Sequence, residues 1–165
     1  MLVGLRRIAC MVLLIVAAAI AIGPARAADG PPVPDPADLI KLVHGTMLAV
    51  VEGNAKGDYT SLHAMGSPAF QRENTPQTLA DGFKPIRTSG FDLAAIASKM
   101  PLTTRSPTLD RNGRLRILGY YDLLDRQVVY DVIYDYDQVL ARWQLAGISV
   151  TPRVLPPQPK LMQPE

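Results

Sequence analysis

Phenol and carboxylate groups alternate along residues 127–136, with Tyr130 and Tyr134 at even positions and Asp131 and Asp135 at odd ones. A carboxylate base beside a phenol donor can perform general acid–base catalysis in a buried site. Because side chains alternate between the two faces of a strand, the tyrosines of this segment share one face and the aspartates the other. The spacing therefore separates the two groups that such a reaction needs together.

Other residue types that carry chemistry are sparse. His44 and His63 are 19 residues apart and have no i, i+4 partner, so they form no helical metal-binding pair. The glycines match neither nucleotide-binding fingerprint, no Gly-x-Ser-x-Gly elbow is present, and Cys10 is the single cysteine. Asp58 is explained by helix capping. We expect partly buried, hydrogen-bonded histidines, and no metal, cofactor or catalytic residue.

Four aromatic residues are of types that commonly line a ligand pocket. Phe83, Tyr130, Tyr134 and Trp143 can line an apolar cavity with a few polar tips, as is common in small-molecule sites. The alternative is that they fill the core, as aromatic residues at such positions usually do. Trp143 in particular is expected to be a core anchor. These four are the candidate ligand-pocket residues.

The first 27 residues have the three parts of a secretory signal peptide. Arg6 and Arg7 form a positive n-region, residues 8–23 are continuously apolar, and Ala25-Arg26-Ala27 supplies small residues before a cleavage site. At about 1.5 Å per residue in a helix, this 16-residue run falls short of the ~30 Å hydrocarbon core. Cleavage after Ala27 is favoured over a retained anchor, which predicts a periplasmic or secreted bacterial protein that meets the membrane only in transit.

Cleavage also changes the charge of the protein. The whole chain has a formal charge of +2, with 17 Lys plus Arg against 15 Asp plus Glu. Three of the arginines leave with the signal peptide, so the mature chain has 14 basic residues and a charge near −1. This balance argues against nucleic acid as a partner. Cys10 leaves too, and a chain without thiols suits an oxidising compartment.

Prolines mark the two ends of the mature chain. Four lie in residues 31–36 and five in residues 152–164. Such segments lack backbone donors and apolar bulk, so they predict extended linkers. The expected organisation is a signal peptide (1–27), a Pro-rich linker (28–36), one domain (37–151) and a Pro-rich, disordered tail (152–165).

The first half of the domain is predicted to be helical. A polar residue followed by proline marks three helix starts: Asp35-Pro36, Ser67-Pro68 and Thr75-Pro76. An apolar stripe from Leu39 to Val51 makes the first helix long, with a predicted stop at Gly53-Asn54. A short helix restarts after Gly57-Asp58, and the helix from Thr75 ends before Gly90.

The second half is predicted to be strands, over residues 103–109, 114–121, 127–136 and 142–151. On the third strand, the tyrosine face should meet the helices and the aspartate face should meet water or a partner. Helices followed by an antiparallel meander indicate an α+β fold.

This order resembles the NTF2-like superfamily, in which helices pack into a strongly curved antiparallel sheet to form a cone. The segments that carry the resemblance are Gly57-Asp58-Tyr59, Ser67-Pro68-Ala69-Phe70, Gly90-Phe91-Asp92-Leu93 and the stretch from Trp143 to Val150. The closing stretch is similar to the last strand of many small exported bacterial members. The resemblance covers about residues 35–151. It implies the cone and a central pocket but no single activity, because the family includes isomerases, dehydratases, transport factors and noncatalytic domains.

The resemblance leaves two classes of function open. We expect an exported noncatalytic domain that binds a small apolar ligand or a protein partner in the cell envelope. The alternative is a small isomerase or lyase that resembles ketosteroid isomerase, with Tyr130 or Tyr134 as the phenol and a carboxylate or His63 as the base.

The resemblance also implies an interaction surface, because NTF2-like domains often dimerise through the open face of the sheet. On this chain a homodimer would use the mixed patch of Val129 and Ile133 among the aspartates. Leu123 and Leu124, at a predicted hairpin tip, would add to this patch.

Overall fold

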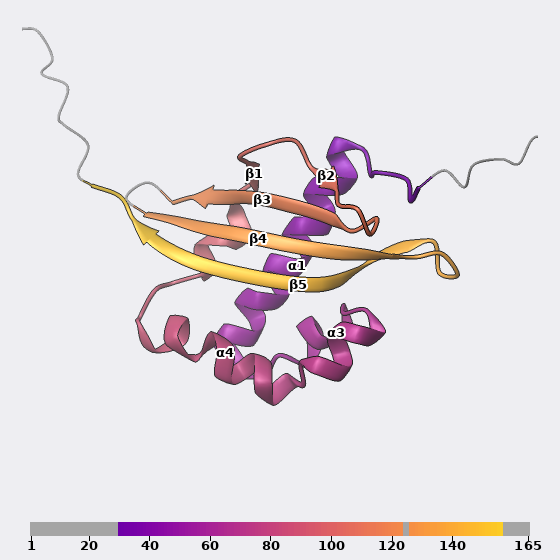
Figure 1. Ribbon diagram of the computed structural model, residues 1–165. Helices are drawn as coiled ribbons and strands as arrows, with labels where there is room; N and C mark the ends of the chain where they lie inside the picture. The colour runs from indigo at the N-terminus through magenta and orange to yellow at the C-terminus, as the bar shows by residue number, and fades with distance from the viewer. Residues whose placement is uncertain (1–29, 124–125, 157–165) are drawn as a thin grey trace, which may run out of the picture.

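The computed structural model describes residues 30–123 and 126–156 and has an α+β architecture (Figure 1). The elements, in chain order, are α1 (Pro36–Lys56), α2 (Thr60–Ala64), α3 (Pro68–Glu73), α4 (Pro76–Thr88), the 3₁₀ helix η1 (Ala94–Ser98), β1 (Leu102–Thr103), β2 (Thr108–Leu109), β3 (Leu115–Asp122), β4 (Arg126–Asp137) and β5 (Arg142–Val154). The predicted fold class is confirmed. The predicted signal peptide, its cleavage site and the tail from residue 157 lie outside the described residues.

The helix starts are confirmed in their atomic detail. The side chains of Asp35, Ser67 and Thr75 each accept a hydrogen bond from a backbone N–H three residues later. Proline follows each cap at the first helical position, where its missing N–H costs nothing. The capped helices α1, α3 and α4 therefore begin where the sequence predicts.

The predicted end of the first helix was wrong by about one turn. α1 continues through Gly53 to Lys56 and ends at Gly57, which has a φ of 71° and donates its N–H to the carbonyl of Gly53. Gly53 is needed for packing, because a Cβ there would collide with the ring of Tyr59. This glycine therefore lets Tyr59 close over the helix, while Gly57 provides the left-handed C-terminal cap.

The sheet has the strand order β1-β3-β4-β5, all antiparallel, with β2 also paired to β3. The predicted strand 103–109 is wrong, because its two ends form the separate strands β1 and β2. β5 runs three residues past the predicted end at Thr151, and Pro152, Arg153 and Val154 pair with β4. The first residues of the predicted tail are therefore strand.

The core lies between α1 and one face of the sheet, which α1 crosses in Figure 1. On β4 the predicted inward face is confirmed: Val128, Tyr130, Val132 and Tyr134 are buried, while the residues between them are half-exposed. Among the described residues, no helix is both long and apolar enough to cross a bilayer.

Candidate functional site

The hydroxyls of Tyr130 and Tyr134 are bonded within the fold. Tyr134 Oη lies 2.9 Å from Oγ1 of Thr46 on α1, and Tyr130 Oη donates to the carbonyl of Leu102 at 3.0 Å. Both side chains are about 1% exposed. These phenols join β4 to α1 and to the short strand β1, which is a structural role.

Tyr121 is a third buried phenol, which the sequence analysis did not single out. Its hydroxyl lies 3.0 Å from Nδ1 of His44, and its ring packs against that of Tyr130. The signal was available in β3, where Leu115, Ile117, Gly119 and Tyr121 alternate inward. His44 is partly buried and hydrogen-bonded, as predicted.

Burial is the main reason that these phenols resist ionisation. It raises the pKa of Tyr130 to about 12 and raises the pKa values of Tyr121 and Tyr134 further still. A phenol that keeps its proton at neutral pH can donate a hydrogen bond but cannot act as a base.

The carboxylates that such a phenol would need lie on the opposite face of the sheet. Asp131 accepts a hydrogen bond from Nε of Arg116 at 2.9 Å, and Asp135 lies 3.2 Å from Nε of Arg114. This confirms the expected separation of phenols and carboxylates.

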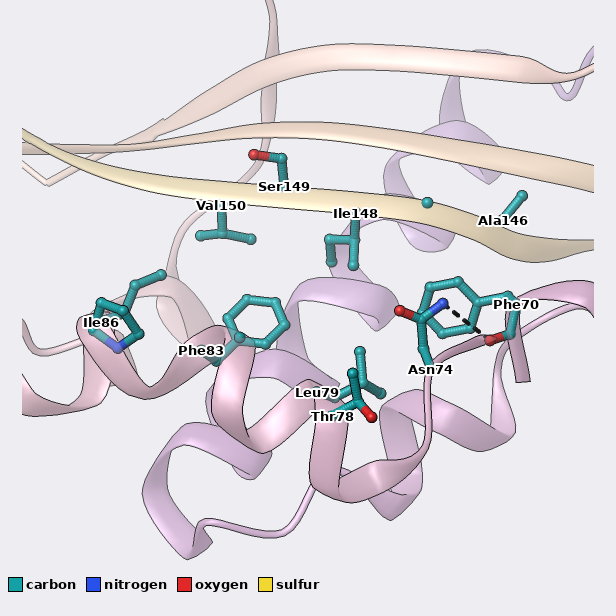
Figure 2. A pocket seen from close by; sticks show the side chains of 13 residues that line it. Phe70, Asn74, Thr78, Leu79, Phe83, Ile86, Ala146, Ile148, Ser149 and Val150 are labelled. Atoms are coloured by element: carbon teal, nitrogen blue, oxygen red, sulfur yellow. Dashed lines mark hydrogen bonds between the residues drawn. The ribbon is translucent and has the colours of Figure 1, made fainter. Parts of the chain in front are cut away.

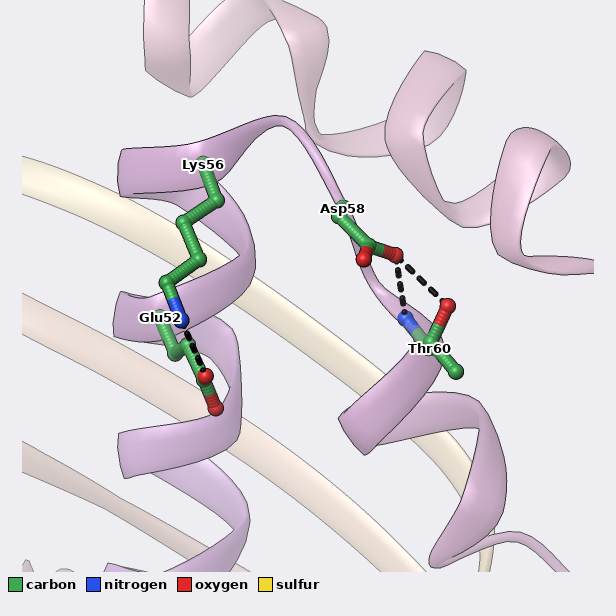
Figure 3. A network of polar contacts seen from close by, with 4 residues as sticks. All are labelled: Glu52, Lys56, Asp58 and Thr60. Carbon is green, nitrogen blue, oxygen red and sulfur yellow. Dashed lines mark hydrogen bonds and ion pairs between the residues drawn. The ribbon is translucent and has the colours of Figure 1, made fainter.

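The remaining candidate acids and bases have local structural partners. Asp58 accepts hydrogen bonds from the backbone N–H of Thr60 at 3.0 Å and from its hydroxyl at 2.6 Å, which lower the pKa of Asp58 (Figure 3). Nearby, Lys56 donates to Glu52 at 2.7 Å and lowers the pKa of that carboxyl. Asp58 thus orders the α1–α2 corner, but it is not the N-cap: that position is Tyr59, which makes no side-chain capping bond, so the predicted cap lies one residue too early.

His63 also has a structural partner. Its Nε2 lies 3.2 Å from the carbonyl oxygen of Gln71, and the side chain is partly buried. The described residues contain no group of three or more His, Cys, Asp or Glu that could hold a metal ion.

The four candidate ligand-pocket residues do not share one cavity. Tyr134 and Trp143 line a small pocket near the β4–β5 turn, with a volume of about 220 Å³. Tyr130 borders a pocket of about 520 Å³ between α1 and β1, and Phe83 lines a groove between α4 and β5. The structure brings Tyr134 and Trp143 together and leaves Tyr130 and Phe83 apart from them.

The α4–β5 groove has a volume of about 570 Å³ and is shown in Figure 2. The side chains of Ile148 and Val150 point from β5 toward Phe83 on α4, while Ser149 points away. All of the lining side chains are uncharged: Phe70, Asn74, Thr78, Leu79, Phe83, Pro85, Ile86, Ala146, Ile148, Ser149 and Val150, with Gly82 and Gly147. The groove is therefore an apolar channel with a few polar groups.

One wall of the groove is the free edge of the sheet. At Leu145 this edge is covered, because Leu145 donates to the carbonyl of Met65 at 2.9 Å and accepts from the N–H of Ser67 at 2.7 Å. A bulge follows, in which Ala146 is the extra residue. Because of this extra residue, the residues whose backbone groups point away from β4, toward the free edge, are Ile148, Val150 and Pro152.

Pro152 supports this assignment independently. Proline is tolerated in a strand where its nitrogen faces away from the neighbouring strand. Alternation then places the N–H and C=O of Ile148 and Val150 outward as well. Within the described ranges, no backbone hydrogen bond crosses this edge beyond Leu145. The apolar side chains and the free backbone groups of these two residues thus meet at the rim of the groove.

The opposite, outer face of the sheet is the predicted dimer surface. Val129 and Ile133 are half-buried there among the Arg116–Asp131 and Arg114–Asp135 ion pairs. Leu123 does not extend this patch, since it is only 8% exposed, and Leu124 lies outside the described residues. The homodimer remains a prediction.

Comparisons of this chain with models of known protein families, with curated proteins and with solved structures found no match.

Proposed function

We propose that this protein is an exported, noncatalytic NTF2-like domain whose α4–β5 groove binds an extended segment of a protein partner in the cell envelope. The observation that carries the proposal is the outward-facing backbone of Ile148 and Val150 beside an apolar groove. The family assignment rests on the order of elements in the sequence and on the α+β architecture, and export rests on the first 27 residues.

The chemistry of the groove favours a peptide over a purely apolar small molecule. An added strand donates and accepts hydrogen bonds at every second residue, and those same residues direct their side chains to the groove side. An apolar ligand would fill the space beside Phe83 but leave the backbone groups of β5 without protein partners. We therefore expect a segment with apolar residues at alternate positions and no proline at those positions.

A small apolar ligand is the second candidate, and the pocket between α1 and β1 supports it. This pocket of about 520 Å³ is lined by Leu39, Ile40 and Val43 of α1, with Tyr130 behind them. Native mass spectrometry of the protein purified from the periplasm distinguishes the two candidates. A retained small molecule that is lost on denaturation would favour the α1–β1 pocket over the groove.

The isomerase or lyase alternative has less support. Tyr130 and Tyr134 bond to groups of the fold, and Asp131 and Asp135 pair with arginines on the outer face. A catalytic site of this kind needs a base and a donor in mutual reach of one substrate.

The peptide proposal can be tested with a phage-displayed library of random linear peptides, panned on the immobilised protein. Selected peptides are synthesised and titrated by calorimetry against Val150→Pro and Val150→Ala. Proline removes the outward N–H and repeats the arrangement already present at Pro152, whereas alanine keeps the N–H and trims the side chain. We expect Val150→Pro to lose at least about tenfold more affinity than Val150→Ala. Equal losses would contradict strand addition.

A further inference from the structure

We propose that the segment bound in the α4–β5 groove carries an acidic side chain that pairs with Arg126 at the end of β5. Such pairing rests on the proposed peptide binding, and it adds a charge requirement to the alternating apolar residues. The partner would then be a segment that is apolar at alternate positions and acidic at one end of the bound stretch.

The groove continues beyond Val150 into a second space. This end pocket has a volume of about 520 Å³ and shares Pro85 and Ile86 of α4 with the groove. Figure 2 shows Ile86 at the end of the groove where Val150 lies. The other residues that line the end pocket are Ser89, Gly90, Phe91, Arg126, Pro152 and Val154. A segment that follows β5 past Val150 therefore enters the end pocket.

Arg126 gives the end pocket a positive charge. Among the described residues that line the groove and the end pocket, it is the only charged one. Its Cζ lies 5.4 Å from the centroid of the Phe91 ring, and the residue is half-buried. A guanidinium has several N–H donors in a planar fork that matches the two oxygens of a carboxylate. It can therefore bind a carboxylate in addition to its contacts within the protein.

The register of the sheet brings Arg126 within reach of an added strand. Arg126 is paired with Val154 on β5, and the side chains of both lie on the same face of the sheet as those of Tyr130 and Val150. An added strand lies about 4.8 Å beyond β5, so its residue opposite Val154 would be roughly 10 Å from the Cα of Arg126. The valine between them is 76% exposed. A long arginine side chain and a glutamate can meet across it.

The other end of the groove indicates that the carboxylate belongs to a side chain. There the edge of β5 is covered at Leu145 by its hydrogen bonds to Met65 and Ser67. A segment that ended with its terminal carboxylate at Arg126 would have to enter past this covered position. A segment that leaves through the end pocket avoids it, and it passes Arg126 with its chain continuing. An acidic side chain within the segment is therefore favoured over a chain terminus.

The test uses peptides selected from a phage-displayed random library on the full wild-type protein, then synthesised with an amidated C-terminus and titrated by calorimetry. We expect the selected peptides to share an Asp or Glu at a constant spacing from their apolar residues. Arg126→Gln should weaken binding by at least about tenfold, because it removes a charged hydrogen-bonding partner. Changing the peptide's acid to its amide should weaken binding to the wild type by a similar factor. With that peptide, Arg126→Gln should cause no further loss.

Arg153→Gln is the matched control. Arg153 is exposed at the same end of β5, but it precedes Val154 by one residue, so its side chain lies on the opposite face of the sheet. Removing this charge should change the affinity by less than about twofold, because solvent and salt screen it from the groove. Equal losses in the two variants would show a general attraction between charges and would overturn the pairing. Circular dichroism checks the folding of both variants, and the change of acid to amide in the peptide needs no variant of the protein.

Val150→Pro distinguishes failure of this pairing from failure of the proposed function. Peptides that lose affinity for Val150→Pro but share no acid, or that bind Arg126→Gln as tightly as the wild type, would overturn the pairing and leave strand addition intact. If no peptide is selected, or if the selected peptides bind Val150→Pro as tightly as the wild type, strand addition is contradicted and the pairing with it.

Discussion

The hydroxyl of Tyr134 lies 2.9 Å from Oγ1 of Thr46, which also lies 3.0 Å from the carbonyl of Leu42 one turn earlier in α1. This chain of contacts joins the middle of the sheet to the helix that crosses it. It also uses the phenol that the enzyme alternative would assign to catalysis.

The coupling between these two residues can be measured by a double-mutant cycle. Thr46→Val and Tyr134→Phe should each lower the free energy of unfolding by roughly 0.5–1.5 kcal/mol, because each removes a buried hydrogen-bonding hydroxyl. The double variant should lose about 1 kcal/mol less than the sum, since the second change breaks a bond that is already gone. Urea denaturation followed by circular dichroism gives the values. Strictly additive losses would show that the two hydroxyls are not bonded.

The buried phenols predict an alkaline limit to stability. Burial raises the pKa of Tyr130 to about 12, whereas the unfolded chain releases that proton near pH 10. Above pH 10 the unfolded state therefore binds fewer protons than the folded state, so the free energy of unfolding falls as pH rises from about 10 to 12. Below pH 10 the phenol keeps its proton in both states, so its titration does not lower the free energy of unfolding there.

Tyr130→Phe removes one of these titrating groups. Its unfolding free energy, measured in urea between pH 8 and pH 11, should decline less steeply above pH 10 than that of the wild type. Parallel curves for the two proteins would contradict burial of the Tyr130 hydroxyl.

Two glycines should respond in opposite directions to alanine. At Gly119 a Cβ would meet both the carbonyl of Leu102 and the hydroxyl of Tyr130, so Gly119→Ala should destabilise the fold by about 3 kcal/mol or more. At Gly45 in α1, apart from its chain neighbours and the adjacent backbone of the helix itself, no atom lies within 4 Å of an added Cβ. Gly45→Ala should therefore stabilise by roughly 0.5–1 kcal/mol. Thermal denaturation of both variants checks the pair, and a harmless Gly119→Ala would contradict the close approach of β1 and β3.

The ion pair between Arg116 and Asp131, on the outer face of the sheet, should contribute little to the stability of the fold. Arg116 and Asp131 are paired on a solvated surface, so Asp131→Asn should lower the free energy of unfolding only slightly, and the loss should shrink as salt is added. Denaturation in urea at low and high salt measures both effects. A large loss that salt leaves unchanged would mean that this face is buried, for example in a dimer.

The helix starts and the buried face of β4 could be predicted because each depends on residues that are close together in the sequence. Caps at Asp35, Ser67 and Thr75 depend on a side chain and an N–H three residues away, and the inward face of β4 depends on alternation alone. The misplaced helix end has a long-range cause. Gly53 is a stop signal in isolation, but contact with Tyr59 explains why glycine is there inside the helix.

The candidate site was harder to predict because cavities depend on which elements become neighbours. The sequence indicates that Phe83, Tyr130, Tyr134 and Trp143 are apolar, but tertiary packing distributes them over three separate spaces. The free edge of β5 likewise depends on strand order. Pro152 was the one sequence signal for it, since proline in a strand favours an edge.

The measurement that tests the groove most directly is amide hydrogen exchange of β5 by NMR, in the free protein and with a library-selected peptide. In the free protein, the N–H groups of Ile148 and Val150 should exchange faster than those of Ser149 and Thr151, which face β4. The peptide should slow exchange at Ile148 and Val150 in particular. If these two amides are already as protected as their neighbours, or if a bound peptide leaves them exchanging at the free rate, β5 is not the binding edge.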